Sequence, residues 1–198
     1  MFRDIVTPKN NEEEFIELAL RLGYKKLYLL YDFDKYQNQK PKAFDFGLET
    51  GFIVNPKNIN KAANRFNLLV AKSSEQDRFF IESGKIRLIY GFEETQKKDY
   101  LHQRASGLNH TLCELCKENN VAVGLAYSPL SNEDNLRTSL IMGRMMQNIK
   151  LCQKYKVKTV IGSFSDKPFD MRSPHDIISL FSILGMDRKK IKESLTNI

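Results

Sequence analysis

The chain has 198 residues, with 31 Lys and Arg against 24 Asp and Glu, so its formal net charge is +7. Single cores grow to roughly 250 residues before chains divide, so this length predicts one domain over 1–198. No apolar run approaches the roughly 20 residues of a membrane-spanning helix, which argues against a membrane protein. The start of the chain lacks the apolar segment of a secretory signal, so its three cysteines are expected to stay reduced in a cytoplasmic location.

The positive charge is concentrated in the last third of the chain. Residues 1–133 carry 19 basic and 18 acidic side chains, whereas residues 134–198 carry 12 basic and 6 acidic ones. This asymmetry places the excess beside Arg172 and the C-terminal basic tail 188–192, where it would suit a surface that faces RNA or another polyanion. A solvated helix face would leave the same imbalance, so both interpretations stay open.

Short apolar runs alternate with amphipathic stretches along the whole chain. The predicted elements, in chain order, are a strand (2–6), a helix (12–22), a strand (27–31), a polar loop (32–46), a strand (48–54), a short helix (56–66), a strand (68–71), a helical turn or two (75–82), a strand (86–90), a helix (108–118), a strand (121–127), a long helix (135–155), a strand (157–161) and a helix (174–184).

Several helix ends carry their own signals. Asn11, which precedes three glutamates, is predicted to cap the first helix, and Gly23 to end it. Pro56 and Pro174 are predicted at the first position of their helices, and Ser173 is predicted to cap the helix that Pro174 opens.

Strands rich in Val, Ile and Leu, separated by helices, imply parallel pairing with right-handed crossovers. About seven strands and a similar number of helices in under 200 residues predict an α/β fold. Either a compact α/β barrel or a doubly wound sheet would satisfy this pattern.

Most signatures of protein-borne catalysis are missing. The chain has no phosphate-binding glycine loop and no nucleophile elbow, and His102, His110 and His175 lack the paired spacing of hydrolytic metal sites. Cys113 and Cys116 form a Cys-x-x-Cys, but they lie inside a predicted helix without a second pair of ligands. They are therefore predicted to be small core residues rather than a zinc or redox site.

Two parts of the sequence resemble a known family. The first is 104–110 (Arg-Ala-Ser-Gly-Leu-Asn-His) with the helix and strand that follow it; the second combines 146–148 (Met-Gln-Asn) with 171–176 (Met-Arg-Ser-Pro-His-Asp). Together they are similar to protein component 3 of archaeal and eukaryotic ribonuclease P, the thirty-kilodalton subunit shared in eukaryotes with ribonuclease MRP. At 162–165 this chain has Gly-Ser-Phe-Ser, where relatives tend toward Ser-Ser-Gly or Ser-Gly-Ala, so the resemblance does not specify that loop.

The resemblance implies a TIM-type (β/α) barrel, related in fold to metal phosphoesterases whose metal-binding histidines are missing in this family. It also implies a protein subunit of an RNA enzyme that removes the 5′ leader from precursor tRNA. The expected partners are the ribonuclease P RNA, precursor tRNA and a second small protein subunit. The RNA carries the catalytic centre and uses Mg²⁺, so no catalytic residue, metal ligand or cofactor is expected on the chain. A stand-alone metal-dependent phosphoesterase and a pure protein scaffold are the competing hypotheses.

Six side chains in or near the matched segments are candidates for RNA contact: Arg104, Asn109, His110, Lys158, Lys167 and Arg172. Arg104 and Arg172 each precede a predicted helix start, where a guanidinium can reach a phosphate beside unsatisfied N–H groups. Lys158 and Lys167 are predicted to flank one loop. Each arginine could instead form a structural salt bridge, Arg104 with Asp99 and Arg172 with Asp170 or Asp176.

Overall fold

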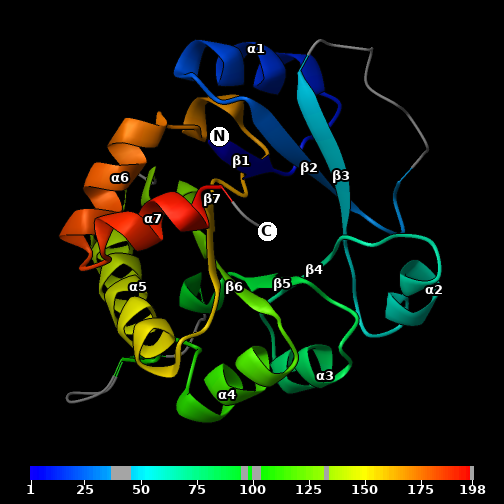
Figure 1. Cartoon of the computed structure of the whole chain (residues 1–198), viewed down its shortest axis with the longest axis vertical. Helices are drawn as coiled ribbons and strands as arrows, with labels where there is room; N and C mark the ends of the chain where they lie inside the picture. Colours follow the sequence, from blue (N-terminus) through cyan, green and yellow to red (C-terminus); the bar gives the residue numbers. More distant parts are fainter. Residues whose placement is uncertain (37–45, 95–97, 100–103, 132–133, 197–198) are drawn as a thin grey trace.

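The computed structural model describes residues 1–36, 46–94, 98–99, 104–131 and 134–196. Its seven strands form one parallel sheet whose spatial order follows the chain, and the sheet curls into a nearly closed barrel with helices outside it (Figure 1). The strands are β1 (Arg3–Val6), β2 (Lys26–Asp32), β3 (Gly47–Ile53), β4 (Leu69–Lys72), β5 (Leu88–Tyr90), β6 (Ala122–Ala126) and β7 (Thr159–Gly162). The sequential order confirms the barrel and excludes the doubly wound sheet.

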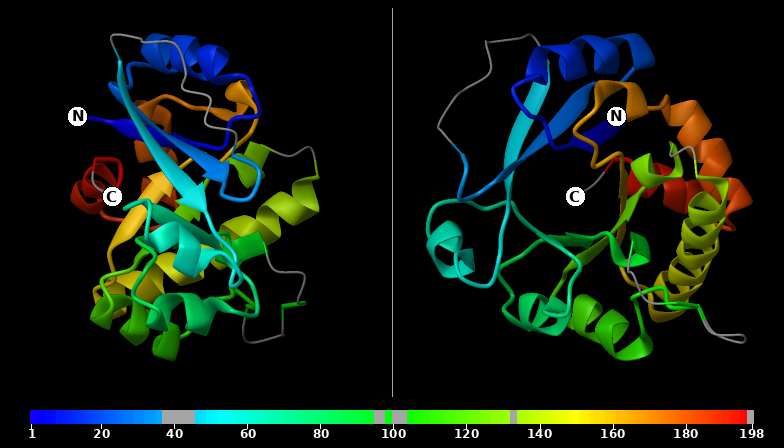
Figure 2. Two further views of the ribbon diagram at one scale, coloured as in Figure 1. Left: turned by 90° about the vertical axis from the view of Figure 1, so that its right-hand side faces the viewer. Right: turned by 180° about the vertical axis from the view of Figure 1, so that it is seen from behind.

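The helices lie outside the barrel wall. They are α1 (Glu12–Leu22), α2 (Ile59–Ala63), α3 (Asp77–Glu82), α4 (His110–Glu118), α5 (Asn135–Tyr155), α6 (Pro174–Ile183) and α7 (Arg188–Ser194), with short 3₁₀ turns η1 (Phe92–Glu94), η2 (Ser128–Ser131) and η3 (Pro168–Asp170). Helix α1 packs on β2, α4 on β6 and α7 on β7 (Figure 2). None of the helices in the described part of the chain has the length and apolar character needed to cross a membrane.

The barrel closes where β7 passes β1. Phe164, just after β7, donates its backbone N–H to the carbonyl oxygen of Ile5 at 2.7 Å, and the N–H of Thr7 donates to Ser165 at 2.8 Å. Strands buried on both faces explain the continuous apolar runs of the sequence. Alternate side chains fill the interior, where the rings of Tyr90 and Phe164 stack at 4.3 Å.

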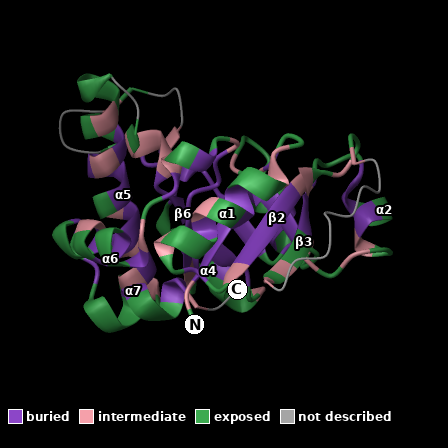
Figure 3. Cartoon of the chain, turned by 90° about the horizontal axis from the view of Figure 1, so that it is seen from above, coloured by how far each residue is buried: buried purple, intermediate pink, exposed green. Residues whose placement is uncertain are grey.

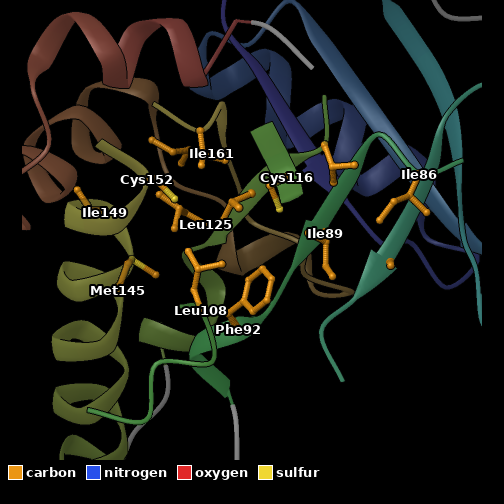
Figure 4. Packing of buried hydrophobic residues seen from close by; sticks show 14 of the residues in the cluster. Ile86, Ile89, Phe92, Leu108, Cys116, Leu125, Met145, Ile149, Cys152 and Ile161 are labelled. Atoms are coloured by element: carbon orange, nitrogen blue, oxygen red, sulfur yellow. The ribbon is translucent and has the colours of Figure 1, made fainter. Parts of the chain in front are cut away.

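A larger apolar layer lies between the strands and helices α2 to α7. Cys113, Cys116 and Cys152 are free thiols buried in it, which confirms that the Cys-x-x-Cys residues are core side chains. Figure 4 shows Cys116 and Cys152 among apolar neighbours that include Leu125. Burial is greatest in the strands, whereas the outward helix faces are exposed, as are the N-terminal turns of α5 (Figure 3).

Two local predictions were wrong. Asn11 does not cap α1, because its amide group bonds to Lys9 N and to the carbonyl oxygen of Asp166. Pro56 is not the first residue of α2, which begins three residues later because side-chain bonds between Asn55 and Asn58 hold a turn before it. The basic side chains of the tail 188–192 are exposed, and the segment forms most of α7, with Ile191 buried against the core.

The other helix signals are confirmed. Gly23 ends α1 at φ 85°, and Ser173 caps α6 by accepting a hydrogen bond from Asp176 N, with Pro174 at the first helical position. His102 and residues 37–45 of the predicted loop 32–46 lie outside the described residues.

Candidate functional site

The C-terminal ends of all seven strands open on one hollow of about 840 Å³, which we call the barrel mouth. In α/β barrels this end carries the functional loops, because each strand leaves the wall there. The stacked rings of Tyr90 and Phe164 form part of its lining. Phe164 has φ 53°, a left-handed conformation that is unusual for a bulky residue.

Charges of both signs line the barrel mouth. Lys9 pairs with Asp166 at 2.5 Å, and Lys72 pairs with Glu94 at 3.2 Å. The mouth is therefore not a uniformly basic surface. Nowhere in the described residues do three or more His, Cys, Asp or Glu side chains gather as a metal site.

A buried hydrogen-bond network holds the backbone of Arg172 at the same end of the barrel. Tyr24 donates its hydroxyl to the Arg172 carbonyl oxygen at 2.8 Å, and Arg172 N–H donates to the hydroxyl of Tyr127 at 3.4 Å. Tyr127 in turn donates to Asp4 Oδ2 at 2.6 Å, while Ser163 N–H donates to Oδ1 at 2.7 Å. Burial raises the pKa of Asp4 to about 6. The network thus joins the Arg172 loop to β1, β6 and β7.

The Arg172 side chain lies exposed on its own loop. Its Nη1 donates to the carbonyl oxygen of Phe169 at 2.7 Å, and its Nη2 donates to Ser131 Oγ at 3.3 Å. The predicted alternative, an ion pair with Asp170 or Asp176, is not formed; both carboxylates instead accept hydrogen bonds from nearby serine hydroxyls. The guanidinium is therefore positioned by neutral acceptors.

The segment that contains Arg104 is clamped to helix α5. Gln147 Nε2 donates to Ser106 Oγ at 3.0 Å and to the carbonyl oxygen of Arg104 at 3.3 Å. Asn148 Nδ2 donates to the carbonyl oxygen of Ser106 at 2.9 Å. The two matched segments, 104–110 and 146–148, are therefore in direct contact.

A partly buried ion pair reinforces this clamp. Arg144 Nε donates to Asp99 Oδ1 at 2.9 Å, and the same oxygen accepts the N–H of Ala105 at 2.9 Å. Asp99 thus pairs with Arg144, so the predicted Arg104–Asp99 salt bridge is wrong for the described residues. Arg144 also donates to the Glu93 carbonyl oxygen at 3.1 Å.

Glu93 and Asn148 form the most deeply buried part of the clamp. Asn148 Nδ2 donates to Glu93 Oε1 at 2.8 Å, and both side chains are almost completely inaccessible. Burial is the main cause that raises the pKa of Glu93, to about 7.

Gly143 provides a seat for the Arg104 guanidinium on α5. A Cβ added at Gly143 would lie 1.6 Å from Arg104 Nη1 and 2.4 Å from Cζ. The guanidinium therefore rests directly on the helix backbone, and not over the N-terminus of α4 as the sequence predicted. Sequence reasoning missed Gly143, although a glycine inside a long helix was an available signal.

Asn109 and His110 begin helix α4. Asn109 Oδ1 accepts the N–H of Leu112 at 2.9 Å, so this side chain is the helix cap and α4 starts at His110 rather than at residue 108. His110 is exposed beside the cap. Both residues follow β5, as Arg104 does.

Lys158 and Lys167 lie at opposite ends of β7, so the prediction that they flank one loop was wrong. Lys167 follows the strand and lines the barrel mouth. Lys158 precedes the strand and lines a hollow of about 240 Å³ at the other end, with Tyr28 and Arg87. The two termini of a strand in a barrel wall lie at opposite ends of the barrel, so residues that precede and follow β7 cannot flank the same loop.

Comparisons with known proteins agree on one family. The family model described as RNase P subunit p30 matches residues 97–198. Ribonuclease P protein component 3 of Methanothermobacter thermautotrophicus is 25% identical over 196 residues, covering 90% of this chain and 78% of that protein. The protein of the same name from Thermococcus kodakarensis is 29% identical over 137 residues, covering 68% of this chain and 59% of the relative.

Solved structures share the fold. A chain in a cryo-EM structure of archaeal ribonuclease P with mature tRNA matches with a TM-score of 0.75 and 18% identity, covering 97% of this chain and 87% of that chain. Ochratoxinase of A. niger matches with a TM-score of 0.62 and 10% identity, covering 98% and 69%. At these identities the similarity establishes the barrel fold alone.

Proposed function

Because this chain belongs to the RNase P subunit p30 family, we propose that it is a protein subunit of ribonuclease P. It binds the catalytic RNA together with a second small protein subunit and promotes removal of the 5′ leader from precursor tRNA. The RNA performs the reaction with Mg²⁺, and this chain supplies no catalytic side chain. The observation that carries the proposal is the family match over 97–198, which contains both clamped segments and the Arg172 loop.

The two candidate arginines support an RNA-facing role. Arg104 and Arg172 are exposed, yet the backbone of each is fixed by hydrogen bonds from other elements. A guanidinium on a rigid support suits recognition of phosphate, because its planar donors then lose little conformational freedom on binding. Asn109 and His110 form the start of α4 after β5, and Lys167 follows β7, so they extend the same RNA surface. Lys158 belongs to a separate contact at the other end of the barrel.

We further propose that the particle acts in the cytoplasm. The three cysteines are free and buried in the described structure, which suits a reducing compartment. Fractionation of cells followed by detection of the chain tests this location.

Reconstitution tests the proposed function. Ribonuclease P RNA and the other protein subunits are assembled with and without this chain, and leader removal from precursor tRNA is measured against Mg²⁺ concentration. We expect the chain to raise the rate and to lower the Mg²⁺ requirement. An unchanged rate and an unchanged Mg²⁺ requirement would refute the proposal.

A variant pair locates the contact. Arg172→Ala is expected to reduce holoenzyme activity without changing the circular dichroism spectrum. Arg78→Ala removes another exposed arginine, one that pairs with Glu82 on α3, and is expected to leave activity unchanged. If the two variants were equally active, Arg172 would have only a structural role within its own loop and no contact with RNA.

The competing hypotheses give different results. A metal-dependent phosphoesterase would turn over a phosphate ester as the purified chain with a divalent metal and no RNA. A pure scaffold would bind its protein partner with little dependence on salt and would not cross-link to RNA. Either outcome would replace the proposed function.

A further inference from the structure

The basic excess of the chain belongs to α5 and to the start of β7. Residues 135–165 contain six basic and no acidic side chains, whereas residues 166–198 contain six basic and five acidic ones. The expectation that the excess lies beside Arg172 and the C-terminal tail was therefore wrong. Solvated helices commonly carry opposite charges three or four residues apart, but the 21 residues of α5 include no carboxylate.

One face of α5 gathers the uncompensated charges. Positions 143, 147, 150 and 154 are spaced alternately four and three residues apart, so they share a face. Gly143 carries the guanidinium of Arg104 in place of a side chain of its own. Lys150 and Lys154 are exposed further along the helix. We call Arg104, Gln147, Lys150 and Lys154 the α5 basic face.

The α5 basic face is long enough for several phosphate groups. With a rise of about 1.5 Å per residue, the seat at Gly143 and Lys154 are separated by about 16 Å along the helix axis. In the described structure, none of the ion pairs involves Arg104, Lys150 or Lys154. Arg104 acts on Asp99 only as a secondary charge beside the Arg144 pair, and Lys154 Nζ lies 5.4 Å from the centre of the Tyr155 ring, so none of the three charges is neutralised by an ion pair within the described residues.

We propose that the α5 basic face binds the phosphodiester backbone of an RNA strand, and that Gly143 is the positioning residue that seats Arg104 in it. This inference rests on the proposed function, because it takes ribonuclease P RNA as the ligand. The chemistry favours backbone contact: a guanidinium, an amide and two ammonium groups can all donate to phosphate oxygens. A row of cations without carboxylates between them attracts RNA irrespective of its sequence.

The seat explains why the Arg104 guanidinium has a defined direction. The Arg104 carbonyl oxygen is held by Gln147, and the neighbouring Ser106 by Gln147 and Asn148. Only a glycine at 143 leaves room for the guanidinium on the helix surface. Any Cβ would displace it while leaving the clamp of the backbone in place.

Charge-removal variants test the site by RNA affinity. The full chain with its partner subunit is titrated with ribonuclease P RNA at several salt concentrations. Lys150→Gln combined with Lys154→Gln is expected to weaken binding about tenfold and to reduce the slope of log affinity against log salt by about 1.5. The matched control is Lys57→Gln combined with Lys61→Gln, which has the same four-residue spacing and lies near α2 on the opposite side of the barrel (Figure 1). This control is expected to change neither the RNA affinity nor its salt dependence.

A double-mutant cycle tests the seat. Gly143→Ala is expected to weaken RNA binding about fivefold in the wild-type background and to have no further effect when combined with Arg104→Ala. Additive losses would show that Gly143 acts independently of Arg104. Thermal unfolding of each variant checks the fold, and the lysine pair still tests the face if the glycine variant does not fold.

The outcomes separate this inference from the proposed function. If the wild-type chain neither binds ribonuclease P RNA nor stimulates cleavage, the proposed function fails. If it does both and the lysine pair binds RNA like the wild type, only the inference is overturned. Exposed Leu136 and Leu140 continue this face, so loss of partner-subunit affinity with unchanged RNA affinity would identify a protein interface and overturn the RNA site.

Discussion

The buried carboxyl of Glu93 should make the stability of this protein depend on pH. Glu93 lies under α5 with 2% of its surface exposed, and its Oε1 accepts a hydrogen bond from Asn148. Burial is the main cause that raises its pKa from 4.5 to about 7, because the charged form loses its hydration. The perturbation we consider is Glu93→Gln, which keeps an oxygen acceptor for Asn148 but cannot ionise.

The sign follows from the direction of this shift. A carboxyl whose pKa is raised in the folded state binds its proton more tightly there than in the unfolded chain. Its contribution to stability is therefore complete below the unfolded value near 4.5 and is lost as the pH rises through about 7. Each pKa unit corresponds to about 1.4 kcal/mol, so the loss approaches about 3 kcal/mol at alkaline pH. Asp4, with its pKa raised to about 6 by burial, acts in the same direction over a lower range.

Urea unfolding followed by circular dichroism measures the effect between about pH 4 and pH 8. We expect Glu93→Gln and the wild type to be similarly stable at the acidic end, with the variant more stable by about 3 kcal/mol at the alkaline end. Subtraction of the two curves removes the contribution of Asp4, which both proteins share. Parallel curves across the whole range would refute the assignment of a raised pKa to Glu93.

Three further substitutions test local geometry by urea or thermal unfolding. Gly107→Ala should lower the free energy of unfolding by more than about 2 kcal/mol, because its φ is 79° and a Cβ would lie 2.5 Å from a backbone oxygen. Gly84→Ala, with φ 63° and open space around the Cβ, should lower it by about 1 kcal/mol. Equal losses for the two variants would contradict this reasoning. Asn109→Ala should cost about 1 kcal/mol by removing the cap of α4, and an unchanged melting temperature would show that the cap contributes nothing. Gly143→Ala should stabilise α5 by up to about 1 kcal/mol, because Ala favours a helix and the displaced Arg104 side chain is flexible; a loss of that size would show a rigid seat.

The strands could be predicted from the sequence because a barrel wall is buried on both faces. Most strands therefore appear as continuous apolar runs, although β3 includes the exposed Glu49 and Thr50, and all seven were located within a few residues. Helix ends were predictable where one residue decides them, as at Gly23 and Ser173. Asn11 and Pro56 were misjudged because side-chain bonds to nearby loop backbone compete with the helix start, and propensity does not reveal such partners.

The candidate site was only partly predictable, because its contacts join distant parts of the chain. The segments 104–110 and 146–148 were identified separately, but nothing in their spacing shows that Gln147 and Asn148 clamp Ser106. The same limitation affected Lys158 and Lys167, which are close in sequence and lie at opposite ends of a barrel wall.

Two residues whose intrinsic preference disfavours the backbone conformation they adopt lie at the proposed functional surfaces. Gly143 lowers the intrinsic stability of α5 by about 1 kcal/mol relative to alanine, yet it alone leaves room for the Arg104 guanidinium. Phe164 adopts φ 53°, at a cost on the order of 1–3 kcal/mol, and its N–H closes the barrel while its ring packs on Tyr90 at the mouth. Local preference explains neither the glycine within α5 nor the positive φ of Phe164. In each case a contact with a distant part of the chain explains the residue. Departures from local preference that are offset elsewhere tend to mark functional positions. By this criterion Gly143 and Phe164 favour a functional role for the α5 basic face and the barrel mouth, independently of the charge of any single side chain.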